Sequence, residues 1–170
     1  MSETEILRLA ANTKEAAAEA AKAFERLRDL LRRKLPDGCE ILHIGATAIQ
    51  DCMTKGDLDI LVRVPADAFA AADACLAELF ERNTGSARTS TFSAFEDAGA
   101  APPLGVQLCS IGGDFDDFHR FVEYLQQSPK LVSDYNALKR RFNGQPMDAY
   151  RQAKGEFVAR VLESGDRGEA

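Results

Sequence analysis

Two aspartates at positions 57 and 59 open an apolar run, and their type and spacing suit metal chemistry. Successive side chains on a strand point to opposite faces, so Asp57 and Asp59 are expected to share one face. Mg²⁺ prefers oxygen ligands in a tight octahedron and keeps water or phosphate at its remaining positions. The pair therefore predicts a divalent-cation site at the start of a strand. The alternating residues are expected to face a core: Leu58, Ile60, Val62 and Val64.

Gly45 lies upstream of this pair, at the end of a short apolar run over residues 39–44 that predicts a strand. Free backbone N–H groups at a strand-to-helix turn suit a phosphate. Residues 47–52 predict a short helix or turn, in which Thr47 would either cap the helix or offer its hydroxyl to the phosphate. His43 is either a hydrogen-bonded structural residue of the strand or a residue that borders the site, and the sequence leaves both interpretations open.

The order of these residues resembles the motif of the nucleotidyltransferase fold, through Ile44-Gly45-Ala46 and then Asp57-Leu58-Asp59-Ile60. A narrower resemblance is to the GrpB-like proteins of that fold. It rests on the stretch His43-Ile44-Gly45-Ala46-Thr47-Ala48, with Lys55 ahead of the acidic strand. The resemblance covers roughly residues 40 to 162 and continues in Phe121 to Leu125, Ser128-Pro129, Tyr135, Leu138, Lys139, Tyr150, Lys154 and Phe157.

This resemblance implies transfer of a nucleotidyl group from a nucleoside triphosphate to an unknown acceptor. Asp57 and Asp59 would be the catalytic residues and would hold Mg²⁺, or Mn²⁺ in its place. Lys55 and Arg120 are either phosphate ligands or an exposed loop lysine and an exposed helical arginine. The nucleotide- and phosphate-binding set is then His43, Gly45, Ala46, Thr47, Lys55 and Arg120.

The chain departs from the family pattern at three places. Ala46 stands where the family favours serine, so one hydroxyl contact to a phosphate is absent. Gln107 and Cys109 stand where GrpB-like proteins tend to carry histidines, and neither face of the strand over residues 104–111 offers the third carboxylate of a two-metal site. Asp114, in the next loop, is either a substitute acid or a helix N-terminal charge. Ala46 and the acid-free strand favour an alternative function, a non-catalytic nucleotide- or metal-binding module. Asp57 departs in the other direction, because many GrpB-like sequences have an apolar residue there, and this chain has the full aspartate pair of the wider superfamily.

The hydrophobic periodicity predicts one α/β (α+β) domain over residues 1–163, with a small mixed sheet, flanking helices and a helical C-terminal third. A long N-terminal helix is expected over residues 3–35, begun by a capping box at Ser2 and Glu5, and it offers a surface for self-association. Residues 164–170 are expected to form a disordered tail. The other helices are expected at residues 65–81, 115–127, 128–142 and 145–163, and the other strands at 57–64, 89–95 and 104–111.

Composition narrows the class of protein. The net charge of −6, from 21 basic and 27 acidic residues, disfavours nucleic acid as a partner. No stretch approaches the ~20 apolar residues of a membrane span, and the first residues lack the basic and apolar regions of a secretory signal, so a cytoplasmic protein is expected. No Cys-x-x-Cys pair is present, which predicts reduced thiols and no structural zinc at Cys39, Cys52, Cys75 and Cys109.

Overall fold

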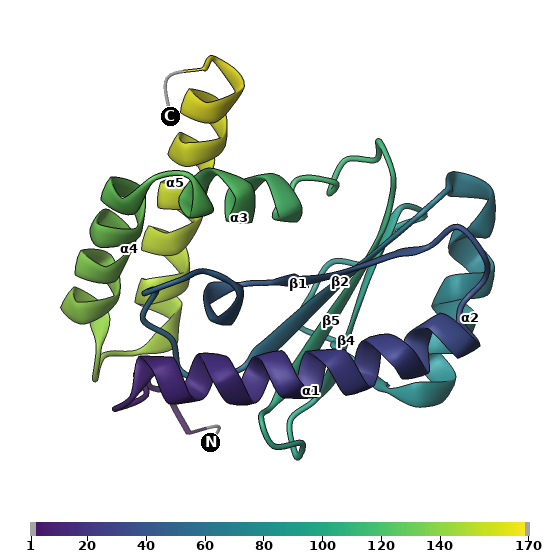
Figure 1. Cartoon of the computed structure of the whole chain (residues 1–170), viewed down its shortest axis with the longest axis horizontal. Coiled ribbons are helices and arrows are strands. Elements are labelled where there is room, and N and C mark those ends of the chain that lie inside the picture. The colour runs from purple at the N-terminus through teal and green to yellow at the C-terminus, as the bar shows by residue number, and fades with distance from the viewer. Residues whose placement is uncertain (1–2, 169–170) are drawn as a thin grey trace.

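The computed structural model describes residues 3–168 and shows a mixed five-stranded sheet with helices on both faces (Figure 1). The strand order is β1-β2-β5-β4-β3. Strand β2 pairs antiparallel with β1 and parallel with β5, and β4 is antiparallel to both β5 and β3. The predicted mixed α/β class is thereby confirmed. The strands are β1 (Glu40–Ile44), β2 (Leu58–Val64), β3 (Glu81–Arg82), β4 (Phe92–Asp97) and β5 (Leu104–Ser110).

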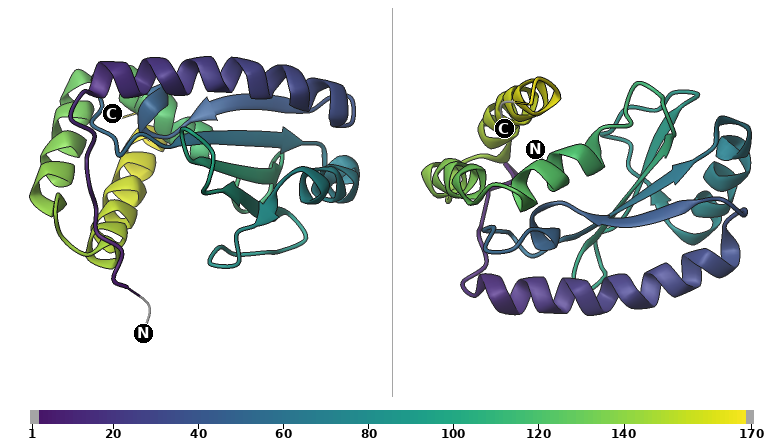
Figure 2. Two further views of the ribbon diagram at one scale, coloured as in Figure 1. Left: turned by 90° about the horizontal axis from the view of Figure 1, so that it is seen from below. Right: turned by 45° about the horizontal axis from the view of Figure 1, so that its top comes forward.

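Two helical groups cover the two faces of the sheet (Figures 1 and 2). Helices α1 and α2 pack on one face, where Ala20, Ala23 and Leu31 of α1 are buried against the strands. Helices α3, α4 and α5 cover part of the other face. The apolar stripe of α1 is therefore used within the chain. The helices are α1 (Thr13–Lys34), α2 (Phe69–Leu79), α3 (Phe118–Gln126), α4 (Pro129–Phe142) and α5 (Met147–Asp166).

Strand β2 confirms the predicted alternation. Its even-numbered side chains are at most 1% exposed and lie in the core beneath α1 and α2. Asp59, Leu61 and Arg63 point to the opposite face, and Leu61 belongs to the second core beneath α3, α4 and α5. A one-residue shift in register would place the carboxylate in the first core. The burial of four apolar side chains therefore fixes where Asp59 points.

The N-terminal helix is shorter than predicted. It begins at Thr13, and the side chain of Asn12 caps it by accepting from the Glu15 backbone N–H at 3.0 Å. The preceding residues are extended and cross the turn between α4 and α5, where the Leu7 N–H donates to the Gln145 carbonyl and the Leu7 carbonyl accepts from the Gly144 N–H. Leu7 is only 2% exposed. The predicted capping box does not form at Glu5, which pairs with Arg151, and Ser2 lies outside the described residues.

Other boundaries differ because tertiary contacts end or extend the elements. Helix α2 stops at Leu79, since residues 81–82 pair with β4 as an edge strand. Strand β4 and helix α3 both begin three residues later than predicted, at Phe92 and Phe118. Helix α5 runs to Asp166, past the predicted start of the tail. Residues 169–170 of that tail lie outside the described part. Within residues 3–168, no helix is both long enough and apolar enough to cross a bilayer.

Candidate functional site

Two adjoining cavities lie on the face of the sheet toward α3, α4 and α5, and Asp59 lines both. The first, here called the polar chamber, has a volume of about 230 Å³ and is lined by Thr54, Lys55, Asp57, Lys139 and Arg151 among others. The second, the apolar chamber, has a volume of about 210 Å³ and is walled mainly by aliphatic and phenyl side chains. Five residues line both chambers: Gly45, Ala46, Asp59, Tyr135 and Lys154.

The carboxylate of Asp59 lies between the backbones of two glycines. A Cβ atom at Gly45 would lie 2.6 Å from its Oδ2, and a Cβ at Gly105 would lie 2.8 Å from its Oδ1. Within residues 3–168, the carboxylate accepts no hydrogen bond. Burial raises its pKa above the usual range, and the positive charge of Lys154 opposes that shift. Asp59 is thus a partly buried acid without a hydrogen-bond partner in the described part of the chain.

Asp57 lies just before β2 and lines the same polar chamber. Its Oδ2 is 2.9 Å from the Lys55 Nζ, while its backbone carbonyl accepts from the Thr47 hydroxyl at 3.1 Å. Both side chains of the ion pair are partly exposed, so the pair is mobile enough to exchange partners and contributes little stability. The structure therefore brings together Gly45, Ala46, Lys55, Asp57 and Asp59 of the predicted set.

Two lysines of the site were not in the predicted set, Lys139 on α4 and Lys154 on α5. Lys139 is 3% exposed, donates to the Met53 carbonyl and has its Nζ 4.1 Å from the centre of the Tyr135 ring. Burial lowers its pKa to about 8. Lys154 is exposed, and its positive charge acts on Asp59 without a hydrogen bond between the two side chains. Both lysines fall in the C-terminal stretch that resembles GrpB-like proteins, and this resemblance was the one available signal.

The structure does not bring His43 or Arg120 to the chambers. His43 faces α1, where it stacks on Phe24 with ring centres 5.2 Å apart and its Nε2 lies 2.9 Å from the Thr47 hydroxyl. Burial lowers the pKa of His43 to about 4. The Thr47 hydroxyl is thus engaged on both sides, by His43 and by the Asp57 carbonyl. Arg120 forms a bidentate ion pair with Asp166, at 2.7 and 2.8 Å.

Strand β5 offers no acid beside Asp59. Gly105 is the register partner of Asp59, and Gln107 follows it on the same face. Asp114 comes after the far end of β5, where Ser110 pairs with Val64, so it does not replace a third carboxylate. Within residues 3–168, no three acidic, cysteine or histidine side chains are grouped to hold a metal. The free carboxylate of Asp59 beside Asp57 fits one divalent cation completed by phosphate and water, and does not fit a two-metal site.

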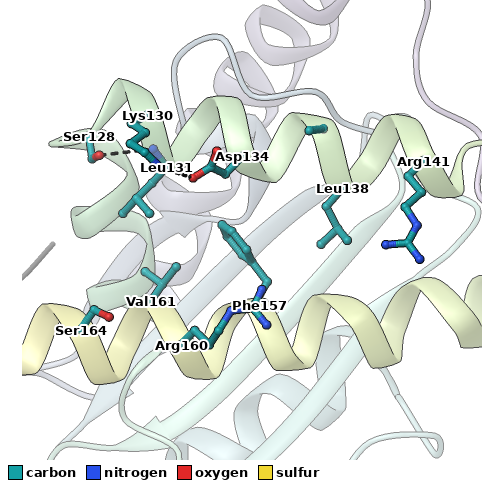
Figure 3. Close-up of a pocket in the computed structure, with 11 residues that line it drawn as sticks. Ser128, Lys130, Leu131, Asp134, Leu138, Arg141, Phe157, Arg160, Val161 and Ser164 are labelled. Atoms are coloured by element: carbon teal, nitrogen blue, oxygen red, sulfur yellow. Dashed lines mark hydrogen bonds and ion pairs between the residues drawn. The ribbon is translucent and has the colours of Figure 1, made fainter.

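A larger groove lies elsewhere, between α4 and α5, with a volume of about 710 Å³. Phe157 projects from α5 toward α4, with Leu131, Leu138 and Val161 around it (Figure 3). Lys130 at its rim is paired with Asp134 at 2.8 Å. None of the predicted site residues lines this groove, which makes it a useful reference surface for matched control variants.

Comparison with known proteins identifies the family. The family model described as GrpB protein matches residues 11–164. The chain belongs to the GrpB family. A UPF0157 protein of Vibrio cholerae is 35% identical over 129 residues, covering 75% of this chain and 68% of that protein. A UPF0157 protein of Deinococcus radiodurans is 32% identical over 148 residues, covering 84% and 76%.

Solved structures agree on the fold. The crystal structure of GrpB from Enterococcus faecalis has a TM-score of 0.64 at 19% identity and covers 85% of this chain and 93% of its own. The Cid1 poly(U) polymerase with bound Mg 3′-dATP has a TM-score of 0.55 at 18% identity and covers 76% of this chain and 41% of its own. At these identities the likeness shows a nucleotidyltransferase-like fold and nothing finer.

Proposed function

We propose that this GrpB-family protein binds a nucleoside triphosphate with one divalent cation at Asp57 and Asp59, and transfers the nucleotidyl group to an acceptor. The observation that carries the proposal is the Asp59 carboxylate, which is partly buried, lacks a hydrogen-bond partner within residues 3–168 and lies at the junction of two chambers. Leaving a charged group in this state costs free energy unless a cation arrives to compensate it. A ligand that brings its own cation would supply that compensation.

The charges of the polar chamber favour an anion that carries a cation over a bare cation. Three lysines, at positions 55, 139 and 154, lie around two aspartates, and Arg151 is balanced by Glu5 at 2.6 Å. This excess of positive charge repels free Mg²⁺ and attracts a triphosphate. Lys55 can move from Asp57 to a phosphate when the cation takes its place, and Lys154 is exposed at the junction of the chambers.

The residues that would hold Mg²⁺ or Mn²⁺ are Asp57 and Asp59, and a bound cation would withdraw charge from the phosphate oxygens. The chain itself supplies position and electrostatics. The two glycine backbones fix the Asp59 carboxylate. Lys139 donates to the Met53 carbonyl, and Asn136 accepts from the Met53 N–H at 2.7 Å. Helix α4 therefore positions the loop that carries Lys55 and Asp57. Such positioning is the main source of catalysis in phosphoryl and nucleotidyl transfer.

Nucleotide binding without transfer is the second candidate function, and one observation favours it. The neighbouring strand presents Gly105 and Gln107 to the site, where a third carboxylate would activate the attacking group. A chain without an acid at this strand position would then bind the nucleotide complex and transfer slowly or not at all.

Calorimetric titration of the full chain with each of the four common nucleoside triphosphates, with Mg²⁺, with Mn²⁺ and with EDTA, tests the proposal. We expect cation-dependent binding that Asp59→Asn and Lys154→Met weaken by at least about tenfold, the loss of one charge-assisted contact. The matched controls Asp134→Asn and Lys130→Met change the same residue types in the α4–α5 groove and are expected to bind as the wild type does. Equal binding by Asp59→Asn and Asp134→Asn would refute the assignment of the site.

Release of pyrophosphate or formation of a labelled product in an acceptor screen separates the two candidate functions. Transfer lost in Asp57→Asn would establish the enzyme. Tight, cation-dependent binding with no transfer to any acceptor would favour the binding module.

A further inference from the structure

The apolar chamber is unsuited to phosphates. Its walls come from β1, α3 and α5, and among the residues that line it in the described part of the chain, Lys154 at the shared junction is the one cation. Desolvating a phosphate against such walls would cost far more than any contact returns. The phosphates therefore belong in the polar chamber, and the apolar chamber is left for a different part of the reaction. Its apolar wall residues are Ile44, Phe118, Phe121, Val122, Val158 and Leu162.

Hydrogen-bond acceptors line this apolar chamber, on Gln107, Asp117 and, at the junction, Asp59. The Oε1 of Gln107 is buried and has no hydrogen-bond partner within residues 3–168. A buried acceptor left in this state costs free energy that a ligand donor would recover. Native structures satisfy most buried polar groups, so this oxygen requires an explanation. A ligand that offers an N–H or O–H group at this point is the simplest one.

Gly105 connects this acceptor to Asp59. The Cβ that Gly105 lacks would lie 2.8 Å from the Asp59 Oδ1 and 3.6 Å from the Gln107 Nε2. Its φ is not in the left-handed region, so the backbone does not require glycine here. The missing side chain instead lets the Asp59 carboxylate lie directly against the Gly105 backbone, close to the Gln107 amide. Because Gly45, Asp59 and Lys154 line both chambers, a molecule in the apolar chamber would lie next to the polar chamber.

We infer that the apolar chamber binds the acceptor, and that the acceptor is a small molecule with an apolar body that carries hydroxyl or amino groups. The inference rests on the proposed function. A volume of about 210 Å³ suits a molecule of roughly one ring with short substituents and excludes a polynucleotide strand. Gln107 and Asp117 favour ligand donors, and the two aspartates of the lining, Asp59 and Asp117, outnumber its one lysine and so disfavour a carboxylate.

The transfer balances with this acceptor. Its oxygen or nitrogen forms a bond to the α-phosphorus, and the bond from that phosphorus to the oxygen bridging to the β-phosphate breaks. Pyrophosphate leaves with the electron pair of the broken bond, and the proton of the acceptor goes to solvent in the polar chamber. No oxidant, reductant or further reactant is needed.

Ligand-observed NMR on the full chain tests the inference with three matched probes: benzylamine, benzyl alcohol and benzoate. We expect saturation transfer to the amine and the alcohol, and binding of benzoate at least about tenfold weaker, since two aspartates and one lysine line the chamber and leave it with excess negative charge. Val122→Phe fills the chamber and Gln107→Leu removes the amide, and each is expected to abolish or weaken probe binding. Leu138→Phe, in the α4–α5 groove, is the control expected to leave it unchanged.

Calorimetry with ATP and Mg²⁺ on the same variants keeps the two proposals apart. Retained ATP binding with lost probe binding in Val122→Phe or Gln107→Leu would support the acceptor site. Loss of ATP binding in both variants, with unchanged thermal unfolding, would show that the chamber holds the nucleobase and would overturn the inference. ATP binding by a wild type that binds no probe would overturn it and leave the proposed function standing. Probe binding without ATP binding would overturn the proposed function and the acceptor role together.

Discussion

Replacing Gly45 with alanine should destabilise the protein through two separable effects. Gly45 has φ 77° and ψ −175°, a region that is essentially restricted to glycine and costs other residues about 1–3 kcal/mol. The new Cβ would also lie 2.6 Å from the Asp59 Oδ2, so the carboxylate or the turn must shift. Together these effects should lower the free energy of unfolding by about 2–4 kcal/mol. For a chain of this size that corresponds to a melting temperature lower by roughly 4–16 °C.

Urea denaturation of a set of glycine variants measures the two effects. Gly144→Ala is the control for backbone strain alone, because its φ is +84° and the added Cβ meets nothing within 4 Å in the described chain. Gly105→Ala is the control for the contact alone, since it approaches Asp59 without a positive φ. In an Asp59→Ala background, the cost of Gly45→Ala should fall, because the contact is removed and only the backbone strain remains. An unchanged cost of Gly45→Ala in the Asp59→Ala background would refute the proposed contact.

Three further predictions concern charge. Asp59→Asn should raise the free energy of unfolding at pH 7 while it removes nucleotide binding, because it deletes a partly buried charge that lacks a hydrogen bond within residues 3–168. Urea melts and calorimetry on the same samples check both effects, and a loss of stability would contradict the reasoning. Asp116→Asn should lower the free energy of unfolding by about 2 kcal/mol at neutral pH, since Arg63 and the Gly112 N–H lower the Asp116 pKa to about 2. The wild type should lose this stability as the pH falls from about 4 to about 2. A variant whose stability falls with acid just as the wild type's does would argue against this prediction. Burial lowers the Lys139 pKa from 10.5 to about 8, so between these pH values the unfolded chain holds a proton that the folded chain has lost. The free energy of unfolding should therefore rise with pH by up to about 3 kcal/mol. Urea melts from pH 7 to 10.5 should show this rise in the wild type and not in Lys139→Met.

The sequence predicts best the part of the site that lies on a regular strand. The period of two in residues 58–64 places four side chains in a core and thereby assigns Asp59 to the other face, as the structure confirms. Gly45 is predictable for a similar reason, because a turn between a strand and a short helix has few alternatives to glycine. Both predictions depend on local geometry, which neighbouring residues determine.

The remaining parts depend on tertiary contacts that no local pattern encodes. Lys139 and Lys154 lie on different helices and meet Asp59 only after α4 and α5 fold against the sheet. His43 lies one residue from Ile44, yet the pleat turns it to the other face, where Phe24 of α1 covers it. The length of the N-terminal helix could not be predicted from its stripe, because residues 5–10 instead hydrogen-bond to the α4–α5 turn and to the Thr54 carbonyl. Arg120 instead pairs with Asp166, 46 positions later in the chain, and so does not line the chambers.

Three lysines line the polar chamber around the partly buried Asp59 carboxylate, which has no hydrogen bond within residues 3–168, and this arrangement determines which ligand the site favours. With Asp59 charged, the lysines reduce its cost but remain too solvated or too distant to pair with it, so part of the penalty persists in the unliganded chain. A phosphate chain would neutralise the lysines and leave Asp59 less compensated than before, unless a cation entered with it. Binding of the anion and of the cation should therefore be coupled, each strengthening the other by the same factor. A site of this kind selects the metal–nucleotide complex over either component alone.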